Sequence, residues 1–272
     1  MDNIDITDCL CCWCDLLGYG KAFVESGWNL RDSRCQKNFE RIAKLGKQLT
    51  FTLAARQVGT KLIFNDGFAS TIDIVPTNKE RYMDILYFIE GIIQDFQSLN
   101  ITDKRNGFPG ARSVLSIGHR FSYDGCNHSY DLIQNRTTAF YPNEFQMNTA
   151  FSKAYIMEES GSKANISGSN LYIDRAVFDF LKEAAQELEC TPPECLKEKD
   201  RIVMKLYSPS GWFADIYFDT DTITYGESSQ YENRGIETTL YRYQRIHSII
   251  DEIASEAALQ QSYRYSIMED DE

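Results

Sequence analysis

The sequence lacks long apolar runs, an excess of basic residues and a supply of histidine. No stretch approaches the roughly 18 consecutive apolar residues of a membrane-spanning helix. With 28 Lys and Arg against 40 Asp and Glu, the formal net charge is -12, which argues against binding to nucleic-acid backbones or anionic membranes. The three histidines have no Cys or Ser partner at nucleophile spacing, which argues against a triad hydrolase. A polyanionic substrate would need metal ions or a local basic pocket.

What is present is the composition of a globular protein. The 272 residues are 43% hydrophobic and 25% charged, and a chain of this length buries a sizeable core without disulfides. The first residues, MDNIDITDCL, are acidic where a secretory signal is basic, so we expect a cytoplasmic protein. Four of the eight cysteines fall within residues 9–14, and we expect small buried hydrophobic side chains there in preference to zinc ligands.

Apolar periodicity predicts strands and helices in alternation. An Asp-Gly turn at 66–67 joins two Ile- and Phe-rich runs into a hairpin, and Thr77-x-x-Glu80 is a capping box before a long helix. Asn148 is a good N-cap for a helix that stops by Gly161. The predicted strands are 9–17, 61–64, 68–75, 111–121, 171–174, 202–207, 212–218 and 240–243. The other predicted helices are 33–57, 176–188 and a last one marked by Ile246, Ile249, Ile250 and Ile253.

This order of elements predicts one α+β domain over residues 1–250, with a substantial sheet and helices packed on it. There is no internal repeat and no linker of low complexity. We expect residues 251–272 to be an acidic C-terminal helix or tail; they hold seven acids and one Arg, which is half of the net negative charge of the chain.

Two aspartates at strand ends are the candidate chemical groups. Asp15 follows the first apolar run, and Asp66 lies at the tip of the hairpin. If the two strands are neighbours in one sheet, the carboxylates converge, and converging carboxylates share a proton or hold divalent cations. Each residue also has a plain structural interpretation, because Asp66 suits an Asp-Gly turn and Asp15 suits a cap or turn before Gly18.

Five segments in the same order along the chain resemble class III nucleotidyl cyclase domains. They are 14–20 (CDLLGYG), 64–69 (FNDGFA), 112–119 (RSVLSIGH), 147–150 (MNTA) and 233–237 (NRGIE) with Tyr241 and Tyr243 after it. The start, the helix at 148–155 and the chain length are most similar to the pyrimidine cyclases of bacterial Pycsar antiphage systems. The resemblance implies a ferredoxin-like βαββαβ core within a mixed or antiparallel sheet.

The resemblance also implies a reaction. In that family the ribose 3′ oxygen attacks the α-phosphorus, which gives a 3′,5′-cyclic nucleotide and diphosphate. Two divalent metal ions, Mn²⁺ or Mg²⁺, would be held by Asp15, Asp66 and the backbone carbonyl of Leu16. UTP, and after it CTP, is the implied substrate.

Further site residues follow from the same resemblance. The turn of Gly18, Tyr19 and Gly20 would let backbone N–H groups approach the phosphates. Asn148 would orient the ribose, and Arg234 would take the place of a polyphosphate-binding lysine.

The helix that begins near Asn148 departs from the family pattern. The family places an arginine four residues after the asparagine to stabilise charge on the α-phosphoryl group, and this sequence has Ser152 there. Lys153 is the next residue, about 100° round the helix. Either Lys153 takes the role of this arginine, or Arg112 or Arg120 supplies the positive charge from another element, or the activity is reduced.

The base-recognition positions also depart from those of purine cyclases. The charged residues that contact a purine edge correspond here to Leu62 and Tyr141, which argues against ATP and GTP. A bulky Tyr141 would shrink the pocket towards a pyrimidine. No residue that distinguishes uracil from cytosine is evident, and UTP is favoured as the commoner substrate of the resembling family.

The resemblance implies a head-to-tail homodimer with shared active sites, because the aspartates of one chain face the asparagine of the other in the family. The messenger would act on a cyclic nucleotide-activated effector in antiviral defence, with no direct contact between the two proteins implied. The alternative is a catalytically impaired class III domain that binds nucleotide as a regulatory or interaction module.

Overall fold

The chain is represented by a computed structural model that describes residues 5–50, 58–64, 66–75, 77–122, 131–132, 137–138, 142–220 and 230–249. The strands are β1 (Asp5–Leu16), β2 (Thr60–Ile63), β3 (Gly67–Asp73), β4 (Ala111–Ser122), β5 (Asp131–Leu132), β6 (Thr137–Thr138), β7 (Leu171–Asp174), β8 (Glu194–Lys197), β9 (Arg201–Ser208), β10 (Gly211–Asp219), β11 (Tyr231–Asn233), β12 (Ile236–Thr238) and β13 (Leu240–Ser248). The α-helices are α1 (Lys21–Glu25), α2 (Gln36–Thr50), α3 (Lys79–Arg105), α4 (Thr149–Ser160) and α5 (Arg175–Glu187). Short 3₁₀ turns lie at Ser33–Cys35, Asn143–Phe145 and Gly161–Ala164.

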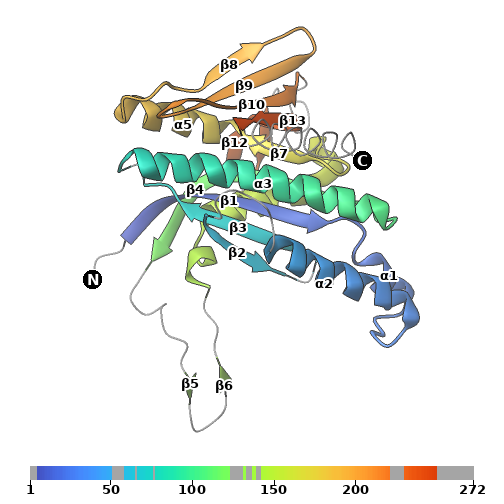
Figure 1. The fold of residues 1–272 in the computed structure, drawn as a ribbon. Helices are drawn as coiled ribbons and strands as arrows, with labels where there is room; N and C mark the ends of the chain where they lie inside the picture. Colours follow the sequence, from blue (N-terminus) through green and yellow to red (C-terminus); the bar gives the residue numbers. More distant parts are fainter. Residues whose placement is uncertain are drawn as a thin grey trace, which may run out of the picture.

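A nine-stranded sheet with the order β2-β3-β1-β4-β7-β13-β10-β9-β8 organises the fold (Figure 1). Its first four strands are antiparallel throughout, with α2 between β1 and β2 and α3 between β3 and β4. This is the βαββαβ order of a ferredoxin-like unit. β4 and β7 pair in parallel, and the later strands are antiparallel. The predicted α+β fold with a mixed, mostly antiparallel sheet is confirmed.

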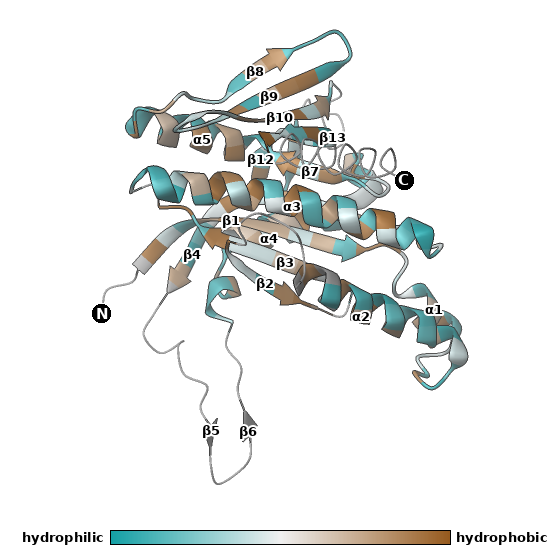
Figure 2. Cartoon of the chain, in the orientation of Figure 1, coloured by the Kyte–Doolittle hydropathy of each residue, from teal (hydrophilic) through white to brown (hydrophobic). Residues whose placement is uncertain are grey.

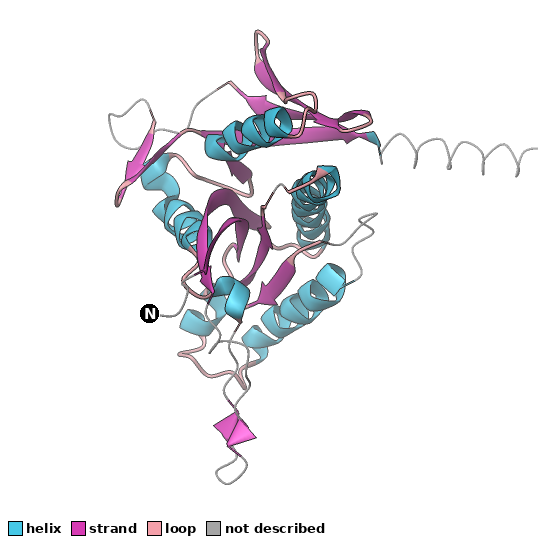
Figure 3. Ribbon diagram, turned by 90° about the vertical axis from the view of Figure 1, so that its left-hand side faces the viewer, coloured by secondary structure: helices cyan, strands magenta, loops and turns pink. Residues whose placement is uncertain are grey.

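Strand β1 is buried on both faces, which explains why its sequence is a continuous apolar run. Cys9, Cys11 and Trp13 point to the side covered by α4. Leu10 and Cys12 point to the side covered by α3 and α5. Figure 3 shows helices on both sides of the sheet. Burial raises the pKa of all four thiols in β1 well above that of an exposed cysteine, which suits side chains that serve as small core residues.

Helix α2 covers a smaller third cluster at the end of β1. Leu45 and Leu49 pack there with Leu16, Phe68 and Leu99. Most residues of α2 on the side seen in Figure 2 are hydrophilic, as expected for a helix that buries one stripe and exposes the rest. Residues 51–57, which the sequence assigns to the same helix, lie outside the described residues.

The structure corrects two predicted helix boundaries. Asn78, and not Thr77, caps α3, because its side-chain oxygen accepts the backbone N–H of Arg81 at 2.9 Å and Asn is at least as good a cap as Thr. The last predicted helix is wrong at Ile246, which lies in β13 and pairs with Ile216 of β10. Pairing with a neighbouring strand outweighs the helical spacing of the isoleucines there.

Candidate functional site

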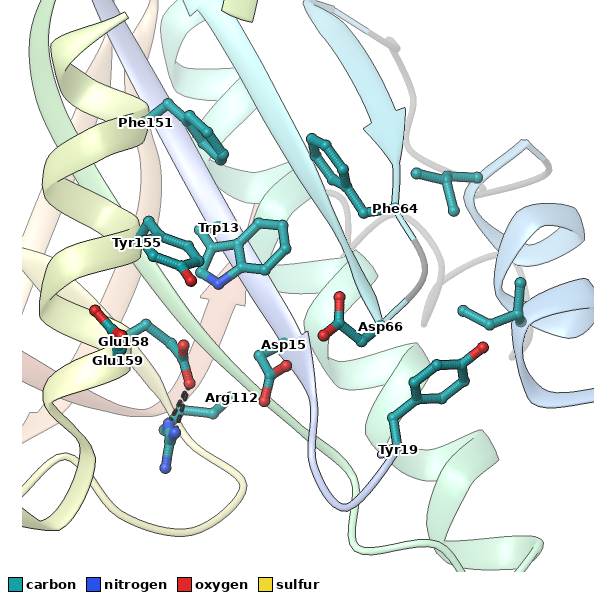
Figure 4. A pocket seen from close by; sticks show the side chains of 12 residues that line it. Trp13, Asp15, Tyr19, Phe64, Asp66, Arg112, Phe151, Tyr155, Glu158 and Glu159 are labelled. Carbon is teal, nitrogen blue, oxygen red and sulfur yellow. Dashed lines mark hydrogen bonds and ion pairs between the residues drawn. The ribbon is translucent and has the colours of Figure 1, made fainter. Parts of the chain in front are cut away.

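The ends of β1 and β3 meet at a cavity of about 850 Å³ that contains both predicted aspartates. In Figure 4 the side chains of Asp15 and Asp66 lie close together at one side of this cavity. Its wall is formed by Trp13, Asp15, Tyr19, Ile42, Ile63, Phe64, Asp66, Arg112, Phe151, Tyr155, Glu158 and Glu159. The predicted convergence of the two strand ends is therefore present within one chain.

Backbone pairing brings the two aspartates together. Asp15 pairs with Gly67 across the β1–β3 ladder, and the backbone N–H of Leu16 donates to the carbonyl of Asp66 at 2.6 Å. No residue other than glycine fits at position 67, since a Cβ there would lie 1.9 Å from the carbonyl oxygen of Cys14. The Asp-Gly sequence thus serves close approach of two strands as well as turn chemistry.

The electrostatics of the cavity favour a bound cation. The pKa of Asp15 is raised from 3.8 to about 6 by burial first, then by the nearby carboxylates of Glu158 and Asp66. Arg112 and Arg41 offset part of this rise. A divalent cation placed among these carboxylates would relieve the repulsion, so the charge balance of the site fits a metal.

The donor set also fits a hard metal ion. The carboxylates of Asp15 and Asp66 are the oxygen ligands that Mg²⁺ and Mn²⁺ prefer. The carbonyl of Leu16 accepts one hydrogen bond, from the N–H of Tyr19 at 3.1 Å, and keeps a second lone pair. Over the described parts of the chain, no three His, Cys, Asp or Glu side chains form a ready metal cage. The remaining ligands would have to be water or substrate oxygens.

The turn after β1 is held in place by α2. Gly18 has φ +70°, a left-handed conformation that favours glycine, and Gly20 precedes α1. Arg41 of α2 donates to the carbonyl of Leu17 at 3.0 Å, and Tyr19 lines the cavity. Of the predicted phosphate-binding turn, the structure therefore places Tyr19 at the cavity itself and Gly18 and Gly20 beside it.

Of the three cations considered as substitutes for the family's helix arginine, only Arg112 lines this cavity. Its guanidinium pairs with Glu158 of α4 at 2.5 Å. Lys153 instead donates to the carbonyl of Ile117 at 3.2 Å, and Arg120 pairs with Asp73 at the opposite end of β3. Within one chain, neither Lys153 nor Arg120 reaches Asp15 or Asp66.

Asn148 caps α4 as predicted. Its side-chain oxygen accepts the N–H of Phe151 at 2.8 Å, and its amide group donates to the carbonyl of Glu144 at 2.8 Å. The thiol of Cys9 also contacts this side chain, and Cys9 precedes Asp15 by six residues on β1, or about 20 Å along an extended strand. In a single chain, Asn148 thus lies beside the middle of β1, whereas Asp15 and Asp66 lie at the C-terminal end of that strand.

The remaining predicted residues lie around the cavity or outside the described residues. Arg234 sits in the turn between β11 and β12 and pairs at 3.7 Å with Glu159, which lines the cavity. Leu62 packs against the apolar cluster beneath α4, whereas its neighbours Ile63 and Phe64 line the cavity. Tyr141 lies outside the described residues.

An aromatic wall beside the aspartates was not predicted from the sequence. Trp13, Phe64, Phe151 and Tyr155 surround the cavity next to the two aspartates (Figure 4). Two signals were available: Trp13 precedes Asp15 by two residues and so shares its face of β1, and Phe151 and Tyr155 are four apart on α4. Glu158 follows Tyr155 by about one helical turn and lines the same cavity, and it was not predicted either.

The sequence matches no protein-family model and no curated protein. Solved structures that resemble the chain include adenylyl and guanylyl cyclase domains. The adenylyl cyclase CyaB from P. aeruginosa is 8% identical, with a TM-score of 0.41 over 89% of this chain and 96% of that one. The guanylyl cyclase Cya2 is 10% identical, with a TM-score of 0.40 over 90% and 95%. A dimeric guanylyl cyclase domain from Blastocladiella emersonii is 13% identical, with a TM-score of 0.42 over 91% and 99%.

Among the described residues, no helix is long and apolar enough to cross a membrane.

Proposed function

We propose that this protein is a metal-dependent class III nucleotidyl cyclase that converts a pyrimidine nucleoside triphosphate, UTP before CTP, to its 3′,5′-cyclic nucleotide and diphosphate. The observation that carries the proposal is the meeting of Asp15 and Asp66 in one large cavity at the end of a βαββαβ sheet. The raised pKa of Asp15 supports it, because burial and the nearby carboxylates disfavour the ionised form, and a bound cation would relieve that repulsion.

Each group at the site has a role that its chemistry allows. Bound divalent ions would lower the pKa of the ribose 3′ hydroxyl and neutralise the triphosphate. Asp15, Asp66 and the Leu16 carbonyl would hold them. Arg112 is the cation placed to contact a phosphate oxygen, provided that it leaves Glu158 or binds both.

The pyrimidine preference rests on the base-recognition positions. Leu62 offers no hydrogen-bonding group to a purine edge, and Tyr141 is bulky. Both features favour the smaller base, and neither separates uracil from cytosine. In the proposed biological role, the cyclic nucleotide activates an antiviral effector, as in the Pycsar systems that the sequence resembles.

The proposed assembly is a head-to-tail homodimer. The separation of Asn148 from the aspartates along β1 supports it, since the partner's copy of Asn148 could complete the site. Mixing Asp66→Ala and Asn148→Ala chains tests this directly. Half of the dimers would then be mixed, each with one intact site of two, so activity should recover to about a quarter of the wild-type value. Two inactive variants that stay inactive together would contradict the shared site.

Incubation of the purified protein with Mn²⁺ and each of the four nucleoside triphosphates tests the activity itself. We expect cyclic product from UTP, less from CTP and none after Asp66→Ala, with Asp200→Ala, an exposed aspartate in the β8–β9 turn, as the matched control. A purine product would refute the base preference, and pyrimidine product from Asp66→Ala would refute the mechanism. Metal-dependent binding without product would favour the nucleotide-binding module.

A further inference from the structure

Three aromatic rings beside the aspartates form a box with two walls and a floor. The rings of Phe64 and Phe151 are nearly parallel, at 8°, with centroids 6.2 Å apart. Trp13 stands close to perpendicular to both, at 72° to Phe64 and 80° to Phe151, with centroids 5.5 and 5.9 Å away. Figure 4 shows Phe151 and Phe64 on opposite sides of the cavity, with Trp13 between and below them.

The box is positioned with respect to the carboxylates by the geometry of β1. Trp13 and Asp15 are two residues apart on one strand, so both side chains point to the same face of the sheet. Phe64 precedes Asp66 by two residues in the adjoining turn, and Phe151 lies on α4 above them. A molecule whose charged end reaches Asp15 and Asp66 through a metal therefore has a flat apolar surface beside it.

One wall of the box and the ring beside it remain open to solvent. The side chain of Phe64 is 36% exposed, and the flanking Tyr155 is 44% exposed. Large aromatic side chains gain stability from burial, so rings kept partly exposed around a cavity are typical of a ligand surface. Nucleobases stack on such rings with about 1–3 kcal/mol per base.

We infer that the pyrimidine base of the nucleotide stacks between Phe64 and Phe151 above Trp13, in the same chain that holds the metal through Asp15 and Asp66. The inference rests on the proposed function and deepens it. It adds this box to Leu62 and Tyr141, the base-recognition positions on which the proposed pyrimidine preference rests. A flat ring needs about 3.5 Å on each face, so the walls must separate by roughly 1 Å to admit it.

Binding without turnover tests the inference. The probes are α,β-methylene-UTP, which cannot release diphosphate, and inorganic tripolyphosphate, which has no base, each with Mn²⁺ in titration calorimetry. Phe64→Ala should weaken binding of the nucleotide analogue about tenfold and leave tripolyphosphate binding unchanged. Phe64→Tyr keeps the ring and should retain affinity within about threefold of the wild type. The matched control is Phe39→Ala, since Phe39 is 42% exposed and lies outside the box.

A second readout follows the floor of the box. The chain has three tryptophans, so Trp28→Phe/Trp212→Phe leaves Trp13 as its only indole. The analogue should quench the fluorescence of this variant, and tripolyphosphate should not. Circular-dichroism melting of each variant checks that folding is unchanged.

The outcomes separate the inference from the proposed function. Full affinity of Phe64→Ala for the analogue, an equal loss with tripolyphosphate, or a greater loss in Tyr141→Leu or Phe39→Ala would overturn the base box while leaving the cyclase activity to stand. Base-dependent binding at Phe64 without cyclic product from any nucleotide would keep the box and overturn the catalysis. Failure of the wild type to bind the analogue would overturn both.

Discussion

Replacing Asp15 with asparagine should stabilise the metal-free protein at alkaline pH. Asp15 is ionised at pH 8 in the folded and the unfolded chain, but only the folded chain places it among Glu158 and Asp66 in a partly buried cavity. Its pKa rises from 3.8 to about 6, and this rise corresponds to a free energy of about 3 kcal/mol that disfavours the ionised carboxylate in the folded chain. The side chain keeps access to the solvent-filled cavity, so we discount this to about 1–2 kcal/mol of destabilisation.

The size of this effect depends on pH in a defined way. Because the pKa of Asp15 is raised on folding, the destabilisation by its ionised carboxylate is complete above pH 6. It shrinks as the pH falls from about 6 towards 3.8, because the folded chain binds the proton at a higher pH than the unfolded chain does. Asp15→Asn should therefore raise the free energy of unfolding by about 1–2 kcal/mol at pH 8 and change it little near pH 4. Urea denaturation of wild type and variant at several pH values measures the difference.

Two comparisons make this result specific to Asp15. Glu232→Gln removes an exposed carboxylate on β11 and should change stability by less than about 0.5 kcal/mol at either pH. Added Mn²⁺ should raise the melting temperature of the wild type more than that of Asp15→Asn, because the variant lacks a carboxylate of the proposed metal site. An equal or lower stability of Asp15→Asn at pH 8 would refute the account of the cavity as a site of uncompensated negative charge.

Three further changes test the frame around the site. Arg41→Ala leaves the buried carboxylate of Asp103 without its partner at 2.5 Å, and should cost about 3–5 kcal/mol in urea denaturation, against less than about 0.5 kcal/mol for Lys44→Ala on the exposed side of α2. Gly67→Ala drives a Cβ into the backbone of Cys14 and should weaken Mn²⁺ affinity in calorimetry. Removal of metal with EDTA should abolish binding of α,β-methylene-UTP, and unchanged binding in EDTA would contradict the role given to the aspartates.

The features of the fold that could be predicted from the sequence are those fixed by local chemistry. The Asp66-Gly67 turn, the cap at Asn148 and the apolar run of β1 each depend on neighbours within a few residues along the chain. From these, the approach of Asp15 to Asp66 could be predicted, because only one further assumption was needed, that β1 and the hairpin are adjacent.

The features that could not be predicted from the sequence depend on partners distant along the chain. Arg112 was one of several candidate cations until its pairing with Glu158, 46 residues away, placed it in the cavity. The box of Trp13, Phe64 and Phe151 joins a strand, a turn and a helix, and no single segment signals it. Ile246 has helical spacing to its neighbours, but β10 pairs with it.

The charge of the cavity explains how an acidic chain can take a polyanion. Four carboxylates and one guanidinium line it, with Arg112 held by Glu158 and Glu159 paired to Arg234. Asp15 and Asp66 have no ion pair within the described residues, so they leave a charge of about -2. Two divalent ions would convert this to about +2, a site that attracts a triphosphate. In the proposed mechanism, the same carboxylates that repel the free nucleotide would admit it once metal is bound, and metal binding would then be the step that controls substrate entry.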